Sequence, residues 1–234
     1  MTEGVTGRGI GHPADPAEVS AGARYAERLA RLAAAGHDLH GEARFCADLL
    51  ARAGPPGRGA GAGPRTGPRA RILDAGCGTG RVAAQLAELG FDCAGTDLDP
   101  SMHAEARRLA PGVPWVLADL AALDLPAAGV AEPFDLAVMA GNVVPLAGKA
   151  DVPAVLARLA AHLRPGGLLV AGFGLDAANL PGGVVPVPLG DYDRAAAAAG
   201  LALHERYATW DAEPYAGGGY AVSVHRRAGS DASG

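Results

Sequence analysis

A short apolar strand that runs directly into a glycine-rich turn constrains this fold more than any other feature. The strand Arg71–Asp74 is followed by Gly76, Gly78 and Gly80, and apolar residues with helical spacing continue over residues 82–89. Glycines at alternate positions let the backbone turn tightly and let a ligand approach it, because no Cβ atom is in the way. The start of the helix adds unpaired N–H groups. This unit therefore predicts a nucleotide-binding turn at the end of the strand.

The spacing of the glycines distinguishes two classes of nucleotide-binding turn. In the dinucleotide-binding fingerprint the third glycine comes three residues after the second. Here that position is Arg81, and the glycine comes one residue earlier, at Gly80. A nicotinamide-dependent Rossmann oxidoreductase therefore stays open only as an alternative.

The stretch Leu73–Gly80, Leu-Asp-Ala-Gly-Cys-Gly-Thr-Gly, resembles motif I of the class I S-adenosylmethionine-dependent methyltransferases. The common form of that motif is an acidic residue followed by x-Gly-x-Gly-x-Gly, and Asp74 with the three glycines fills every place. The resemblance extends over about residues 71–173. It implies an enzyme that uses S-adenosyl-L-methionine to methylate a nucleophilic O, N or C of a small molecule. A non-catalytic regulatory protein that binds the same cofactor is a second alternative.

Strand-like and helix-like patterns alternate from Arg71 onward, which is typical of a parallel sheet covered by helices on both faces. We expect strands near residues 71–74, 92–97, 114–118, 134–140, 168–173, 201–209 and 219–225. We expect helices between them near residues 80–89, 101–109, 152–162 and 192–199. The turn between the last two strands is rich in acids and glycine, which suits an antiparallel hairpin, and the resemblance implies the same arrangement. The predicted fold class is α/β: a Rossmann-like doubly wound sheet, mostly parallel, with a C-terminal antiparallel hairpin and an N-terminal helical cap.

The composition along the chain indicates one folded domain with additional segments before and after it. We expect a flexible tail at 1–20, a cap of two helices at 21–52 with a turn at Gly36–Gly41, and a linker at 53–69. Half of residues 51–70 are glycine or proline, which is too many for a packed element. The S-adenosylmethionine-binding methyltransferase domain is expected at 70–227, followed by a second flexible tail at 228–234.

The balance of charged residues indicates which kind of partner the chain binds. The chain has 20 Lys and Arg against 25 Asp and Glu, a formal net charge of −5. This balance argues against a broad phosphate-binding surface. The stretch Ala140–Asn142 also departs from the Asn/Asp-Pro-Pro-aromatic signature of the methyltransferases that modify amino groups of bases. We therefore expect a small-molecule methyl acceptor and no nucleic-acid partner.

Cysteine and histidine usage bears on the compartment and on metals. The cysteines Cys46, Cys77 and Cys93 have neither a metal-type spacing nor an even count, which indicates reduced thiols in a cytoplasmic protein. His37 and His40 have no carboxylate-rich motif beside them, so no metal site is expected. No apolar run approaches the roughly 20 residues of a membrane span, and no signal-peptide pattern opens the chain, so we expect no membrane partner.

The resemblance assigns cofactor contacts to the ends of successive strands, where doubly wound sheets bind their ligands. Motif I would wrap the methionine part of the cofactor, with Asp74 reaching its ammonium through water. Asp97, 17 residues after Gly80, matches the family's ribose-binding acid, since a carboxylate accepts strong hydrogen bonds from hydroxyls. The alternative for Asp97 is an N-cap of the next helix, which is the favoured role of Asp99.

The adenine end of the cofactor is expected after the third strand. Asp119 matches the family's acceptor for the adenine amino group, with a surface-loop aspartate as the alternative, and Leu120 would pack on the ring. Leu98 and Met102 would line the other adenine face or belong to the core. The complete set of expected cofactor contacts is Asp74, Ala75, Gly76, Cys77, Gly78, Thr79, Gly80, Asp97, Leu98, Met102, Asp119, Leu120, Ala140 and Gly141, the last two through backbone carbonyls.

The methyl group of the cofactor is already activated, so its transfer is a direct in-line displacement. Positioning can supply most of the acceleration, about 7–11 kcal/mol, and a general base contributes only where the acceptor must lose a proton. The loop Leu175–Leu189 is the expected wall of the acceptor pocket. Tyr25 as a core aromatic and Asn142 as a loop cap are structural alternatives. The candidates for catalytic or acceptor contacts are His40, Asn142 and Tyr25, followed by Glu42, Asp176, Tyr192, Trp210 and Asp211.

Overall fold

The computed structural model describes residues 19–53 and 69–229. The two predicted tails and the predicted linker lie almost entirely outside these ranges, so they stay predictions, as does the division of the chain into units. Among the described residues, every helix is too short or too polar to span a bilayer.

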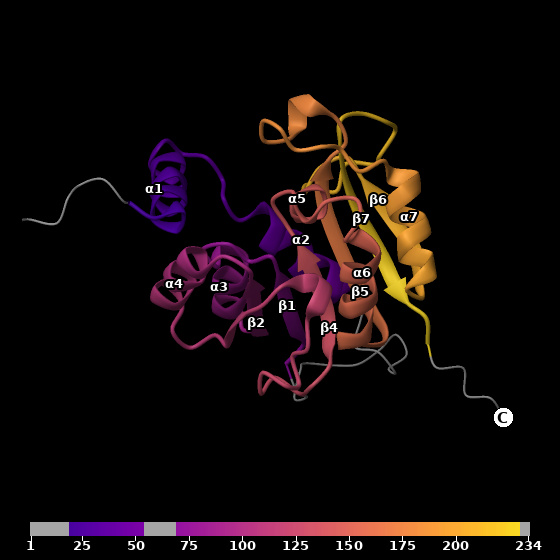
Figure 1. Cartoon of the computed structure of the whole chain (residues 1–234), viewed down its shortest axis with the longest axis horizontal. Coiled ribbons are helices and arrows are strands. Elements are labelled where there is room, and N and C mark those ends of the chain that lie inside the picture. Colours follow the sequence, from indigo (N-terminus) through magenta and orange to yellow (C-terminus); the bar gives the residue numbers. More distant parts are fainter. Residues whose placement is uncertain (1–18, 54–68, 230–234) are drawn as a thin grey trace, which may run out of the picture.

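Seven strands form one sheet in the order β3-β2-β1-β4-β5-β7-β6 (Figure 1). The strands are β1 (Arg71–Ala75), β2 (Asp92–Asp97), β3 (Trp115–Leu117), β4 (Phe134–Met139), β5 (Leu163–Gly174), β6 (Leu201–Tyr207) and β7 (Tyr220–Arg227). Strands β1 to β5 pair in parallel, and β7 is antiparallel to both β5 and β6. This confirms the predicted mostly parallel sheet that ends in an antiparallel hairpin. The strand order reverses between β1 and β4, where doubly wound sheets form their ligand crevice.

Helices cover both faces of the sheet (Figure 1). One face carries α5 (Val143–Ala147), α6 (Val152–His162) and α7 (Leu189–Ala198). The other face carries α2 (Gly41–Ala53), α3 (Arg81–Glu88) and α4 (Pro100–Leu109). Successive side chains of a strand point to opposite faces, so Ile72 packs with the second group of helices and Leu73 with the first. All six residues of β4 are buried, as expected of a central parallel strand.

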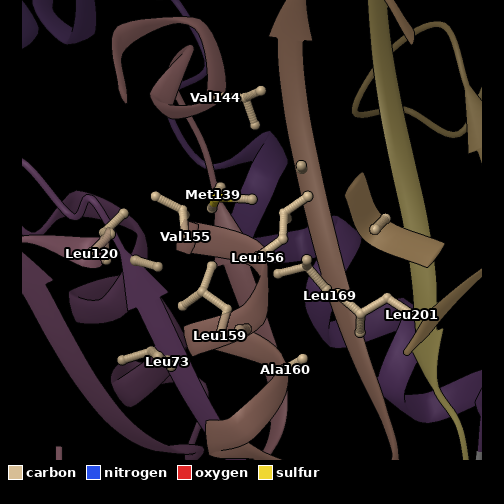
Figure 2. Packing of buried hydrophobic residues seen from close by; sticks show 14 of the residues in the cluster. Leu73, Leu120, Met139, Val144, Val155, Leu156, Leu159, Ala160, Leu169 and Leu201 are labelled. Carbon is tan, nitrogen blue, oxygen red and sulfur yellow. The ribbon is translucent and has the colours of Figure 1, made fainter. Parts of the chain in front are cut away.

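The core on the α6 face fixes the strands that carry the site (Figure 2). Leu156 and Leu159 of α6 point toward the sheet and pack among Met139 of β4 and Leu169 of β5. All four side chains are at most 1% exposed. Burial of apolar surface is the main favourable term in folding, so this packing holds the ends of β4 and β5 in a fixed position.

The two N-terminal helices make different contacts. Helix α2 lies on the sheet, where Phe45 and Leu49 are buried in the same core as β1 and β4. Helix α1 (Ala21–Ala34) packs instead beside α4, and Gly22 is its only buried residue. The N–H of Gly22 donates to Ser101 Oγ at 2.9 Å. A Cβ atom at position 22 would overlap the backbone carbonyl of Ser101, so glycine is what allows this close approach.

Strand β5 begins earlier than the sequence predicts. The pattern Pro165–Gly167 predicts a turn before a strand at 168–173, but β5 starts at Leu163. Phe134 pairs with Leu163, and the pairing then shifts so that Leu136 pairs with Leu168. Gly166 has a φ of 76°. The turn-forming residues therefore make a bulge inside the strand. The short elements α5, η1 (Leu120–Ala122) and η2 (Ala177–Asn179) are also absent from the sequence prediction.

Candidate functional site

A cavity of about 440 Å³ opens at the carboxyl ends of β1, β2 and β4. Twelve of the fourteen predicted cofactor residues line it: Asp74, Gly76, Cys77, Gly78, Thr79, Asp97, Leu98, Met102, Asp119, Leu120, Ala140 and Gly141. Ala75 and Gly80 do not line it. Ala75 is fully buried in the core, and Gly80 packs against Trp115 and Ala106.

The glycine turn joins β1 to α3 along one wall of this cavity. Gly76, Gly78 and Gly80 all have a positive φ, between 53° and 82°, a region that side chains other than glycine rarely adopt. A Cβ atom would lie 2.6 Å from Val143 at Gly76 and 2.6 Å from Trp115 at Gly80. At Gly78 it would meet nothing within 4 Å. Glycine at positions 76 and 80 therefore allows Val143 and Trp115 to pack closely against the turn, whereas Gly78 leaves free space beside the cavity.

Asp97 at the end of β2 faces the glycine turn. Its Oδ2 accepts a hydrogen bond from Gly78 N at 2.7 Å, and its Oδ1 accepts one from Asp99 N at 2.9 Å. An ionised carboxylate has about four acceptor positions, so two further donors fit on this group. The acid and the glycine turn thus meet at one cavity.

The acids beyond Asp97 also act as helix caps. Asp99 caps α4 by accepting from Ser101 N at 2.7 Å, which confirms its predicted role. Asp119 lines the cavity and caps η1 by accepting from Ala121 N at 2.9 Å. Leu98 and Met102 line the cavity as well, and Leu98 is 67% exposed. An acid flanked by apolar side chains suits a flat ring that carries an amino donor.

Asp74 lies beneath the glycine turn and is 1% exposed. Its Oδ2 accepts a hydrogen bond from Ala83 N in the first turn of α3 at 3.0 Å. Burial raises the pKa of this carboxyl from its ordinary value of 3.8 to about 7, because the charged form loses its hydration. Asp74 therefore joins β1 to α3, and a cation in the cavity would favour its ionised form.

The three catalytic candidates occupy different places. Tyr25 of α1 lines the cavity. His40 lines a separate cavity of about 340 Å³ between α1, α3 and α4. Asn142 is not among the lining residues: its Oδ1 accepts from Gly174 N at 2.7 Å, and its Nδ2 donates to the carbonyl of Asn179 at 3.2 Å. With a φ of 68°, Asn142 joins the end of β4 to the end of β5.

The secondary candidates have structural partners. Glu42 is paired with Arg81, and Asp176 caps η2 by accepting from Ala178 N at 3.0 Å. Tyr192 is wrong as an acceptor contact, because it is fully buried in the core and its ring packs against His225. Trp210 donates to Tyr220 Oη at 3.0 Å, and Asp211 is exposed.

Several residues that line the first cavity were not predicted from the sequence. Arg81 lines both cavities, and its sequence signal is its place where the dinucleotide fingerprint has glycine. Val143, Leu146 and Asp151 follow β4 and also line the first cavity. Their positions depend on α5, which has no pattern of its own in the sequence.

The three cysteines are buried and unpaired. Cys77 lies in the glycine turn and lines the cavity. Burial raises the pKa of its thiol far above the ordinary value, and raises the pKa of Cys93 to about 12. These thiols stay protonated at neutral pH and are poor nucleophiles. The described residues contain no group of three or more metal-ligating side chains.

Comparisons with known proteins agree on one family. The family described as "Methyltransferase domain" matches residues 72–167. The chain is 38% identical over 128 residues to trans-aconitate 2-methyltransferase of Methylobacterium nodulans, which covers 54% of this chain and 42% of that protein. The chain thus spans less than half the length of the curated relatives it matches.

Solved structures match over more of the chain. A TehB-like SAM-dependent methyltransferase from Corynebacterium glutamicum is 32% identical, with a TM-score of 0.70 over 88% of this chain and 97% of that one. An amino pentose methyltransferase from Micromonospora echinaspora, solved with bound S-adenosylmethionine, is 25% identical, with a TM-score of 0.64 over 86% of this chain and 96% of that one.

Proposed function

This chain belongs to the S-adenosylmethionine-dependent methyltransferases, and from that premise we propose that it transfers a methyl group from S-adenosylmethionine to a nucleophilic O, N or C of a small molecule. The observation that carries this proposal is the convergence of the glycine turn, Asp97 and Asp119 on one cavity. The nicotinamide alternative has no support in the comparisons.

The residues of the cavity fit the cofactor. The open space at Gly78 admits a ligand against the backbone, and Asp97 has acceptor capacity left for the ribose hydroxyls. Asp119 and Leu120 would hold the adenine. Asp74 would face the ammonium of the cofactor. The positive charge of that ammonium would favour the ionised form of the buried carboxyl. When bound, S-adenosylmethionine supplies a methyl group on a sulfonium, which a nucleophile can displace directly.

The chain contributes mainly by positioning. Asp97 and the glycine turn hold each other in place, and Asn142 fixes the ends of β4 and β5 beside the cavity. We propose that helix α1 acts as the cap over this site, because its Tyr25 lines the cavity. Oriented reactants gain about 7–11 kcal/mol over free collision, so such a site needs a general base only for acceptors that must lose a proton.

The proposed acceptor is a small molecule that enters near the ends of β4 and β5, with the loop 175–189 as a wall. Similar proteins are named for a carboxylic acid, trans-aconitate, and for an amino pentose. These two classes are the first to screen. The net charge of −5 argues against a nucleic-acid acceptor. The buried, unpaired cysteines support our proposal of a cytoplasmic location.

Calorimetric titration with S-adenosylhomocysteine and with NADH tests the cofactor. We expect S-adenosylhomocysteine to bind and NADH not to bind. Asp97→Ala should weaken binding by about 1.5–3 kcal/mol, because hydrogen bonds to a charged group are lost. Asp92→Ala, at the opposite end of the same strand, is the matched control and should leave binding unchanged. Binding of NADH alone would end the proposal. Release of S-adenosylhomocysteine with a carboxylate or amino-sugar acceptor tests turnover.

A further inference from the structure

Two aromatic side chains from the C-terminal hairpin lie over the end of β5. Tyr220 begins β7, and Trp210 belongs to the segment that joins β6 to β7. A Cβ atom at Gly172 of β5 would overlap the Trp210 ring and would lie 2.8 Å from Tyr220 Oη. Glycine at this position therefore lets both side chains lie directly on the strand. Both side chains are partly exposed.

These aromatic side chains stand one strand away from the proposed cofactor cavity. Met139 of β4 pairs with Ala171 of β5. The next residues along the two strands, Ala140 and Gly172, are therefore neighbours, and Ala140 lines the cavity. Neighbouring strands are about 4.8 Å apart. The cavity follows the ends of β3, β2, β1 and β4, and β5 and β7 come next in the sheet, so an acceptor that approaches the cavity past β4 meets Tyr220.

The hydroxyl group of Tyr220 is a donor that is free to bind a ligand. Trp210 Nε1–H donates to Tyr220 Oη at 3.0 Å, so the phenol oxygen is the acceptor in this contact. A phenol also carries one O–H donor, and within the described part of the chain no acceptor takes it. Burial raises the pKa of Tyr220 to about 12, because the phenolate would lose its hydration. Tyr220 therefore keeps its proton at neutral pH, where it can donate a hydrogen bond but cannot act as a base.

The acids near this hydroxyl already have partners. Glu42 is close enough for its charge to raise the pKa of Tyr220, and it accepts from both Nη atoms of Arg81 at 2.6 and 2.8 Å. Asp176, which follows β5, accepts three hydrogen bonds on its Oδ1 within the turn of η2. The five aspartates that line the cofactor cavity come from segments other than β5 and the hairpin. This edge of the sheet therefore offers an acceptor a donor rather than a base.

A donor without a base suits an acceptor that is already an anion. A carboxyl group has an ordinary pKa of about 4, so it is ionised at neutral pH. One of its oxygens can accept the hydrogen bond while the other forms a bond to the methyl carbon. The bond from that carbon to sulfur breaks, and its electron pair stays on sulfur. A carboxylate and a sulfonium thus become a neutral ester and a neutral thioether, and no proton moves.

We propose that the methyl acceptor is a carboxylate, and that the O–H of Tyr220 binds it beside Ala140 for methylation on oxygen. Trp210 is a positioning residue, because its N–H occupies the Tyr220 oxygen and directs the O–H away from the indole. This inference rests on the proposed function, because it needs S-adenosylmethionine in the adjacent cavity.

Calorimetric titration of the protein loaded with S-adenosylhomocysteine tests the inference. The probes are trans-aconitate, a carboxylate, and glucosamine, an amine without a carboxylate. We expect trans-aconitate to bind and glucosamine not to bind. Tyr220→Phe keeps the ring and removes the hydroxyl, so it should weaken trans-aconitate binding by about 10- to 100-fold, the range for a hydrogen bond to a charged group. Its affinity for S-adenosylhomocysteine should stay that of the wild type.

Steady-state kinetics distinguish recognition of the acceptor from a structural role. Tyr220→Phe should raise KM for trans-aconitate by about the same factor without lowering kcat, because the carboxylate loses its charge in the transition state and the hydrogen bond does not favour that loss. Trp210→Phe should raise KM less. In a Tyr220→Phe background it should have no further effect, since it acts through that hydroxyl.

Tyr207 supplies the matched control. Its ring packs against Phe45, as the Trp210 ring does, but its hydroxyl already donates to Glu205 Oε2 at 2.6 Å. Tyr207→Phe therefore removes a hydroxyl from the same aromatic group without removing a free donor. The dissociation constant of trans-aconitate should stay unchanged in this variant.

The outcomes separate the inference from the function. Binding of S-adenosylhomocysteine without binding of trans-aconitate would overturn the inference and leave the proposed function standing. A Tyr220→Phe protein that binds trans-aconitate like the wild type, or that loses affinity for both ligands together, would show that the hydroxyl only holds the hairpin in place, and would overturn the role of Tyr220. A wild-type protein that binds neither ligand would overturn the proposed function as well.

Discussion

Burial of one carboxyl group at the site makes stability depend on pH. The pKa of Asp74 is raised to about 7 by desolvation, while the unfolded chain keeps the ordinary value of 3.8. Between these two values the folded protein binds a proton that the unfolded chain has released. The free energy of unfolding therefore falls as the pH rises through this range, and it levels off above about pH 7.

Asp74→Asn should remove this pH dependence. Relative to the variant, the wild-type free energy of unfolding should fall by up to about 1.4 kcal/mol for each pH unit between about pH 4 and pH 7. The asparagine can still accept a hydrogen bond from Ala83 N. Urea denaturation at several pH values in this range measures the difference. Parallel curves for the two proteins would mean that Asp74 is ionised in the folded state.

Residues with local partners could be predicted, and residues with distant partners could not. The role of Asp99 as a helix cap depends on residues two and three positions ahead. The partners of Asn142 are Gly174 and Asn179, both more than thirty residues away. The burial of Tyr192 likewise depends on Phe173 and His225, which the sheet brings together. Such contacts exist only once the chain has folded.

At the scale of elements, the strands could be predicted because they are short segments that alternate with helix-like patterns and are bounded by turn residues. Strand β2 matches the expected residues 92–97 at both ends. Strand β5 differs because a glycine and a proline mark a bulge as readily as a turn, and only the pairing with β4 decides. Helix α5 has five residues, including Pro145, which is too few for a periodic pattern.

Helix α1 meets the backbone of α4 in one close contact at Gly22, so a methyl group at this position should loosen the helix. Gly22→Ala places a Cβ atom against the backbone of Ser101, where neither backbone can yield cheaply, at a cost of roughly 1–3 kcal/mol. We expect faster hydrogen exchange throughout α1, with little change in the sheet. Gly112→Ala, at a position with open space around it, is the control. Unchanged exchange in α1 would show that other contacts hold this helix.

At the scale of the whole molecule, the site is built from segments that are far apart in the sequence. Residues near 76, 97, 119 and 140 come together because β1, β2, β3 and β4 are neighbours in one parallel sheet. Carboxyl ends of parallel strands lie on the same edge of the sheet. A ligand in this cavity therefore contacts four strand ends and α1 at once, and should stabilise these segments together.

This arrangement predicts the size and the location of stabilisation by ligand. S-adenosylhomocysteine at about 100 times its dissociation constant should raise the free energy of unfolding by about 2.7 kcal/mol. The same concentration should stabilise Asp97→Ala less. Hydrogen exchange should slow at residues 76–81, 97–102, 118–122 and 140–143, and in α1 through Tyr25. The hairpin of β6 and β7 lies at the other edge of the sheet, beyond β5, and serves as the internal reference. Slower exchange around the cavity at the opposite end of β1, lined by Arg71 and Phe91, would place the ligand elsewhere and contradict the proposed site.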